Sequence, residues 1–224
     1  RLHRRPGQQL RRRARRSGIS VLGKWRKPRR FERNLVVIGA GAGGLVTAYL
    51  AAALKAKVTL VEKHRMGGDC LNTGCVPSKA LIRSARLLAQ MARAGEFGIR
   101  EARAEFDFAE VMARVQRTVQ AIEPHDSIAR YSALGVEVIE GAARILTPWE
   151  VEIARKDGAR QTLTTRSIVV AAGARPVVPA IPGLDEVGYL TSDTVWNLGE
   201  LPGRFLILGG GAIGCELAQA FARF

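Results

Sequence analysis

A run of twenty residues without a charged side chain, from Leu35 to Leu54, constrains the fold of this chain more than any other feature. A transmembrane helix has this length, but four glycines, at positions 39, 41, 43 and 44, interrupt the run. A short strand over Leu35–Ile38, a glycine-rich turn and a helix from about Ala42 describe it better. A further apolar stretch, Val58–Val61, completes a β-α-β unit. The sequence therefore predicts an α/β fold with a doubly wound parallel sheet.

The turn has the Gly-x-Gly-x-x-Gly spacing of a dinucleotide-binding loop, at Gly39, Gly41 and Gly44. Such glycines allow a tight turn, close approach of the backbone to a pyrophosphate, and close packing of the helix on the strand. The N-terminus of the following helix favours the phosphates. Glu62 stands eighteen residues after Gly44, where an acid suits the hydroxyls of a ribose. A turn made only for packing does not explain this acid, so a dinucleotide site is predicted.

Two of the three cysteines, Cys70 and Cys75, lie in a loop rich in Gly, Asn and Thr. Pro77 suits the first turn of a helix, and a helix N-terminus favours a reactive thiolate at Cys75. A structural disulfide fits poorly where the sequence shows no export pattern, and a zinc site needs more ligands than His64 adds. Two buried free cysteines would not require so dense a loop. A redox dithiol is the best interpretation of the pair.

A second strand–glycine–helix pattern stands 170 residues after the first, with Gly209, Gly211 and Gly214 following an expected strand over Phe205–Leu208. One chain then holds two dinucleotide sites and a dithiol between them. Electron transfer among a nicotinamide, a flavin and a disulfide needs all three parts. The order of the motifs therefore predicts an oxidoreductase that uses NAD(P)H and FAD.

The other elements give weaker signals. Apolar residues at helical spacing predict an amphipathic helix over 107–123, and another helix is expected near Pro77–Arg93. Short strands are expected over Val136–Ile139, Val151–Ile153 and Ser167–Ala171.

Most of the net charge of +15 lies in one segment. Residues 1–33 hold fourteen Arg and Lys and one acid, whereas residues 34–224 hold twenty-one Arg and Lys and nineteen acids. We expect 1–33 to be a disordered or weakly helical tail. A solubilising linker is the plain interpretation, and a segment beside an anionic membrane is the next. A transit peptide would also be rich in arginine, but it would contain more serine than this segment does. No specific nucleic acid is expected as a partner, because only Trp25 and Phe31 could stack on bases.

The block Gly-Gly-x-Cys-x4-Cys-x-Pro-x-Lys over 67–79, between the two glycine motifs, resembles the pyridine nucleotide–disulfide oxidoreductases. That group includes glutathione reductase, dihydrolipoamide dehydrogenase and mercuric reductase, and residues 68–82 are most similar to mercuric-reductase-like members. The resemblance covers about 34–224. It implies a Rossmann-like flavoprotein with two dinucleotide-binding domains and a small antiparallel β insertion. Residues 34–200 would be the first part of the FAD domain and 201–224 the start of the NAD(P) domain. The chain is expected to be truncated, and the missing interface domain would form a homodimer.

The resemblance also implies roles for individual residues. Cys75 would be the charge-transfer thiol against the flavin, and Cys70 the interchange thiol that meets the substrate. Lys79 would lie near the flavin N5 and would pair with Glu216. No metal ligands are expected. The remaining cofactor-binding positions that the resemblance implies are Gly68, Ala143 within 141–143, and Gly173 within 168–176.

Two positions depart from the family's pattern and bear on flavin affinity. Asp69 stands where many members have Thr near the flavin pyrophosphate, and Ala172 stands where Thr is usual. The leading substrates are mercuric ion and dihydrolipoamide. A cytoplasmic location is expected, at the inner face of the cell membrane if the basic tail binds lipid. The alternative from another class is a non-catalytic, membrane-associated redox module, against which the retained Cys70 and Cys75 argue.

Overall fold

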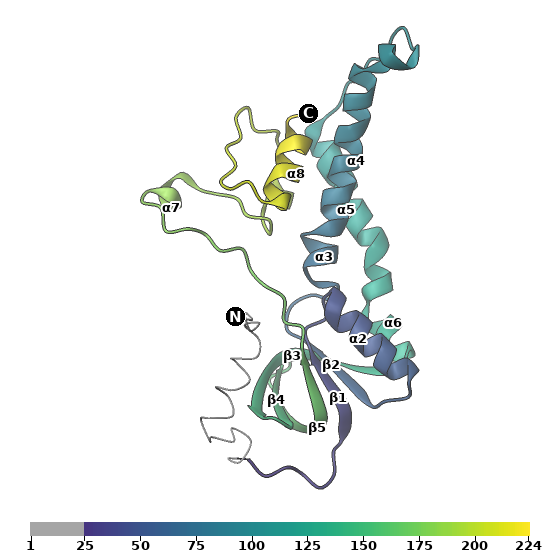
Figure 1. The fold of residues 1–224 in the computed structure, drawn as a ribbon, viewed down its shortest axis with the longest axis vertical. Coiled ribbons are helices and arrows are strands. Elements are labelled where there is room, and N and C mark those ends of the chain that lie inside the picture. The colour runs from purple at the N-terminus through teal and green to yellow at the C-terminus, as the bar shows by residue number, and fades with distance from the viewer. Residues whose placement is uncertain (1–24) are drawn as a thin grey trace, which may run out of the picture.

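The computed structural model describes residues 25–224 (Figure 1). The expected β-α-β unit is present as β1 (Arg33–Ile38), α2 (Ala42–Ala53) and β2 (Val58–Glu62), with the two strands parallel. All five residues of β2 are buried. A strand covered on both faces reads as a continuous apolar run, which is why the pattern of β2 was clear in the sequence.

Two long strands join the parallel and antiparallel parts into one closed sheet. β3 (Val136–Thr147) pairs parallel with β2 along its first half and antiparallel with β4 (Glu150–Arg155) along its second half. β5 (Arg160–Val170) pairs antiparallel with β4 and then parallel with β1. The Rossmann-like fold and its antiparallel insertion are confirmed. The predicted strands within 136–147 and 160–170 were correctly placed but too short, because each strand continues from one pairing into the other.

Helices cover one face of the parallel strands and the antiparallel strands cover the other. α2 and α6 (Ile128–Ala133) pack on the first face, where Leu45 and Tyr131 meet Leu60. On the second face, residues of β4 such as Ile153 pack against Val36. Since β1, β2 and the last part of β5 run in one direction, their carboxyl ends share one edge, where ligands bind in open α/β sheets.

Two long helices extend from this edge, α4 (Cys75–Ala92) and α5 (Phe108–Ile122) (Figure 1). α5 confirms the helix predicted over 107–123, and the side chain of Asp107 caps it by accepting from Ala109 N at 2.7 Å. α4 begins at Cys75, two residues before the predicted start. The segment expected as a loop contains the short helix α3 (Gly68–Asn72). The 3-10 turns of this region are η2 (Ala94–Phe97) and η3 (Glu123–Asp126).

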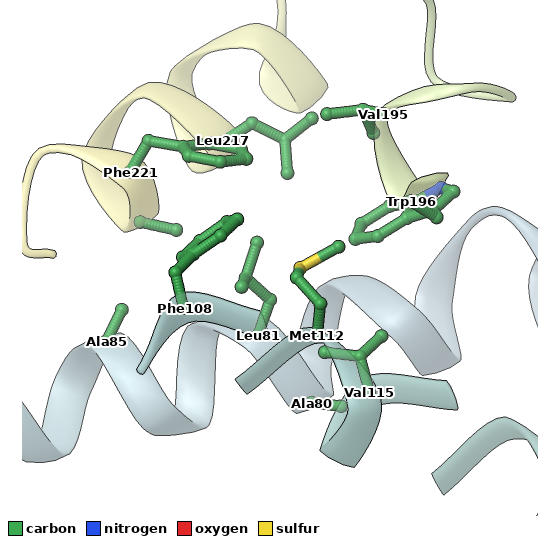
Figure 2. Close-up of a cluster of buried hydrophobic side chains, with 11 residues drawn as sticks. Ala80, Leu81, Ala85, Phe108, Met112, Val115, Val195, Trp196, Leu217 and Phe221 are labelled. Carbon is green, nitrogen blue, oxygen red and sulfur yellow. The ribbon is translucent and has the colours of Figure 1, made fainter. Parts of the chain in front are cut away.

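The C-terminal segment returns to the long helices. After α7 (Leu184–Val187) and η4 (Val195–Asn197), α8 (Ala212–Phe221) packs on them. The strand predicted over Phe205–Leu208 is not formed. An isolated strand leaves its N–H and C=O groups unpaired, and no other strand of residues 25–224 pairs with this segment. Figure 2 shows the resulting core, in which Trp196, Leu217 and Phe221 face Leu81, Phe108 and Met112.

Most of the predicted basic tail, residues 1–24, lies outside the described residues. Its last part packs on the antiparallel strands: Lys27 Nζ is 6.0 Å from the ring centroids of both Phe31 and Trp149. Glu32 accepts hydrogen bonds from Thr164 through Oε2. From residue 25 onward, no helix has the length and apolar character needed to cross a bilayer.

Candidate functional site

A cleft of about 1030 Å³ opens at the carboxyl edge of the parallel strands. This volume is at the upper end of the roughly 300–1000 Å³ of small-molecule sites, and it suits a dinucleotide. The walls come from the turn after β1, the end of β2, α3, β3 and the chain after β5. Six predicted cofactor positions line the cleft: Gly39, Gly41, Glu62, Gly68, Ala143 and Gly173.

The glycine turn forms one wall. Gly39 has a φ of +101°, and the carbonyl of Ala171 occupies the space that a side chain would need. Gly44 does not line the cleft, but the carbonyl of Gly39 leaves no room for a Cβ there, so Gly44 lets α2 pack on the turn. No side chain caps α2 at Gly41. The first N–H groups of a helix have no partner within it, so they can hold an anion at this end.

Glu62 forms the wall at the end of β2 and is only 9% exposed. Its Oε2 accepts a hydrogen bond from Ala40 N at 2.6 Å, and its Oε1 accepts one from His64 N at 2.7 Å. Two backbone donors therefore fix the carboxylate. Each oxygen keeps a further lone pair for a hydroxyl donor, so the position fits the ribose predicted for it.

The cysteine-bearing segment lies directly against the glycine turn. Gly68 has a φ of +55°, and a Cβ there would lie 2.6 Å from Gly41 Cα. Asn72 holds this part of the chain, because its Nδ2 donates to the carbonyls of Met66 at 3.0 Å and Gly68 at 2.8 Å. The two backbones form a cradle that side chains would fill. This is the bare backbone surface that the predicted pyrophosphate site requires.

Both cysteines are free thiols, Cys70 in the short helix α3 and Cys75 at the first position of α4. Cys70 is half-buried and lines the cleft, whereas Cys75 is exposed and lies off its wall. A hydrogen bond with the Cys75 side chain raises the pKa of the Cys70 thiol, and burial raises it further, while Lys79 opposes both. The two thiols are thus neighbours, and together they can be oxidised to one disulfide.

Charged side chains of both signs surround the cleft. Two basic residues that were not predicted as site residues line the cleft: Lys63 directly after β2 and Arg175 shortly after β5. Their place after the carboxyl ends of parallel strands was the available signal. The Oδ2 of Asp69 lies 3.6 Å from where a Cβ of Gly173 would stand, so this carboxylate does lie at the cleft. Within 25–224, no three His, Cys, Asp or Glu side chains gather as a metal site.

Lys79 and Glu216 are not brought together. Both side chains are exposed, and the ion pairs within residues 25–224 do not include a pair between them. The predicted pairing of Lys79 with Glu216 is thus not seen within these residues. Lys79 is exposed but close enough to the thiols for its charge to oppose the rise in the pKa of Cys70.

The second glycine turn repeats the backbone of the first. Gly209 has a φ of +99°, close to the +101° of Gly39. The residue before each helix is also alike, with φ/ψ of −81°/−175° at Gly41 and −73°/172° at Gly211. A Cβ at Gly214 would lie 2.9 Å from the Gly209 carbonyl oxygen, which repeats the close packing at the first turn. The predicted loop therefore forms even though the strand before it does not.

A glycine cradle, a fixed acid at the end of β2 and two neighbouring thiols define a dinucleotide-binding redox protein. The comparison with known families agrees. Residues 33–224 match the family described as pyridine nucleotide-disulphide oxidoreductase, and the chain belongs to this family. Its members use FAD and NAD(P)H.

Individual relatives carry two different names. The chain is 36% identical over 191 residues to a mercuric reductase of Streptomyces lividans. The aligned region covers 85% of this chain and 40% of that protein. The chain is 37% identical over 199 residues to a dihydrolipoyl dehydrogenase of Geobacillus stearothermophilus, covering 87% and 41%. A solved Cu(II) complex of the HOCl-induced flavoprotein disulfide reductase RclA of Escherichia coli superposes with a TM-score of 0.70 at 28% identity, covering 89% and 41%. The chain thus spans about 40% of the relatives that it matches.

Proposed function

We propose that this chain supplies the flavin-binding and dithiol-bearing part of an oxidoreductase that passes electrons between NAD(P)H, FAD and the Cys70–Cys75 pair. One observation carries the proposal: Cys70 lines the same cleft as the glycine turn and Glu62, and its thiol interacts with that of Cys75. Neither nucleotide binding nor folding needs two neighbouring thiols beside this cleft. When bound, FAD supplies a ring that accepts hydride and passes an electron pair to a disulfide.

The residues of this chain have separate roles in binding the cofactor and in the dithiol chemistry. Gly39, Gly41 and Gly68 admit the pyrophosphate to the backbone, and Glu62 accepts hydrogen bonds from a ribose. Cys75 stands at the first position of α4, next to Cys70 in the site. From the resemblance to the family, we assign Cys75 to the flavin and Cys70 to the substrate; in this structure Cys70 is the thiol that lines the cleft.

The electron balance defines the class of substrate. The disulfide takes up two electrons and two protons to become two thiols, and the dithiol returns them to a two-electron acceptor. Mercuric ion and a lipoamide disulfide both qualify, and relatives carry the name of each enzyme. We propose a mercuric-reductase-like activity, with dihydrolipoamide dehydrogenase activity as the second candidate. Residues 34–200 as the first part of the FAD domain, 201–224 as the start of the NAD(P) domain, a place for Lys79 near the flavin, and a homodimeric assembly belong to the same proposal.

An anaerobic dithionite titration of the FAD-loaded protein tests the assignment. We expect a long-wavelength charge-transfer band at the two-electron stage, as a Cys75 thiolate in contact with bound FAD would give. In Cys70→Ser the band should be present before any reduction, and in Cys75→Ser it should be absent at every stage.

The third cysteine provides the control. Cys215 is exposed at the second glycine turn, outside the cleft, so Cys215→Ser should titrate like the unaltered protein. Direct bleaching of the flavin without a band in the unaltered protein would show that the thiols are not coupled to the flavin, and the proposal would be rejected.

A further inference from the structure

We infer that Trp196 is a positioning residue that fixes the linker between Cys70 and Cys75 and thereby sets the balance between dithiol and disulfide. The inference rests on the proposed redox function of this pair. The indole Nε1–H of Trp196 lies 2.7 Å from the carbonyl oxygen of Thr73 and 2.7 Å from that of Ser192. Thr73 stands between the two cysteines, so one shared hydrogen joins their linker to a segment 123 residues away.

The core holds the indole in place. Trp196 is 6% exposed and belongs to the cluster on α4 and α5 (Figure 2), where its ring lies beside Met112. Gln116, on α5, donates to the backbone carbonyl of Trp196 at 3.4 Å. A buried indole N–H must find an acceptor, and here the core aims it at the cysteine linker. The donor is therefore fixed independently of the linker.

The linker is short, and its other backbone hydrogen bonds each tie it to one helix alone: Thr73 N donates to Asp69 O at 2.9 Å, and Gly74 O accepts from Ser78 N at 3.0 Å. α3 ends at Asn72 and α4 begins at Cys75, so only Thr73 and Gly74 join the two helices. Gly74 has φ/ψ of −121°/−109°, and a Cβ there would lie 2.9 Å from Asp69 O. A rotation of the Thr73 carbonyl would turn the start of α4, which carries Cys75, relative to α3, which carries Cys70. The hydrogen bond from Trp196 opposes this rotation.

Substitution Trp196→Phe keeps an aromatic ring in the core and removes the donor together with part of the ring volume. Trp149→Phe is the matched control: its indole lies near Lys27 at the antiparallel strands, away from the thiols. The measured quantity is the equilibrium between dithiol and disulfide in glutathione buffers, read by mass spectrometry of the trapped thiols. No flavin turnover is needed.

We expect Trp196→Phe to change the equilibrium constant between dithiol and disulfide by roughly fivefold, which corresponds to the net contribution of one hydrogen bond. The pH profile of Cys75 alkylation should also change. Trp149→Phe should leave both unchanged. An equilibrium and a profile identical in both variants would overturn the inference and leave Trp196 as a packing residue.

A second measurement applies even if Trp196→Phe does not fold. The chain has three tryptophans, so the double substitution Trp25→Phe and Trp149→Phe leaves Trp196 as the sole indole. Oxidation of the pair with diamide should change its emission, because the linker carbonyl is its hydrogen-bond partner; unchanged emission counts against the inference. A shifted equilibrium in Trp196→Phe without a charge-transfer band in the flavin titration would reject only the proposed function.

Discussion

At the scale of single residues, the shape of the cofactor cleft depends on glycines that have no Cβ atom. Gly68 and Gly41 bring two backbones so close that a Cβ on one would lie 2.6 Å from the Cα of the other. Backbone atoms cannot rotate away as the end of a flexible side chain can. Both the stability of the cradle and its room for a pyrophosphate therefore follow from the absence of one methyl group.

Substitution Gly68→Ala tests this directly. The left-handed φ of +55° and the clash with Gly41 should together destabilise the fold by about 1–3 kcal/mol. FAD affinity should fall at least about tenfold, since the cradle must open by more than the van der Waals contact allows. Urea unfolding and a FAD titration measure the two effects.

Gly95→Ala is the control, because nothing lies within 4 Å of a Cβ built at Gly95. Its stability should stay within about 0.5 kcal/mol of the unaltered protein, with unchanged FAD binding. Equal FAD affinity in the two variants would contradict the pyrophosphate cradle.

At the scale of elements, a polar contact joins three neighbouring strands at the edge opposite the cleft. Arg33 of β1 donates through Nη2 to Glu137 Oε2 of β3 at 2.7 Å, and Thr59 of β2 donates to the same oxygen at 2.5 Å. Partial burial raises the pKa of Glu137, but the hydrogen bonds from Thr59 and Arg33 outweigh it and hold the pKa below its ordinary value.

The sign of the pH dependence follows from this lowered pKa. A carboxyl whose pKa is lower in the folded than in the unfolded state stabilises the protein above its unfolded pKa, and this stability is lost as the pH falls through the folded pKa. Glu137→Gln should therefore lower the free energy of unfolding most at neutral pH and leave it unchanged in strong acid. Because the side chain is 46% exposed, the cost at pH 7 should stay below about 1 kcal/mol. Urea unfolding at several pH values measures it; a cost independent of pH would contradict the ionic contribution.

How far the sequence predicts the elements depends on their periodicity. β2 and α5 have an apolar run and an amphipathic repeat, and both were predicted within one residue. α3 has only five residues, Gly-Asp-Cys-Leu-Asn, too few to show a helical period. The residues of the site likewise divide into those that a local sequence pattern predicts and those that only the packing brings together. Gly39 and Glu62 belong to a local motif, whereas the contact of Trp196 with Thr73 spans 123 residues and exists only through packing.

At the scale of the whole molecule, α8 ties the second glycine turn to the helix that carries Cys75. Phe221 of α8 is 8% exposed, and its ring centroid lies 4.8 Å from that of Phe205 and 6.0 Å from that of Phe108. The sheet cores include none of these residues. The molecule thus has a core on α4 and α5 that is distinct from the cores of the sheet, and α4 belongs to both the dithiol site and that helical core.

Phe221→Ala tests whether these cores unfold as one unit. Removing a buried phenylalanine costs about 3–5 kcal/mol, and if the cores are cooperative the whole protein loses this amount. The far-ultraviolet circular dichroism and, with Trp25→Phe and Trp149→Phe present, the emission of Trp196 should then change at one lower urea midpoint. Ile213→Ala, on the same helix at 60% exposure, should leave the midpoint almost unchanged. If Phe221→Ala shifts the emission alone and leaves the circular dichroism midpoint in place, then α8 detaches on its own. The second turn would in that case be a separate unit docked on α4, and the dithiol linker would lose the packing around Trp196 before the sheet unfolds.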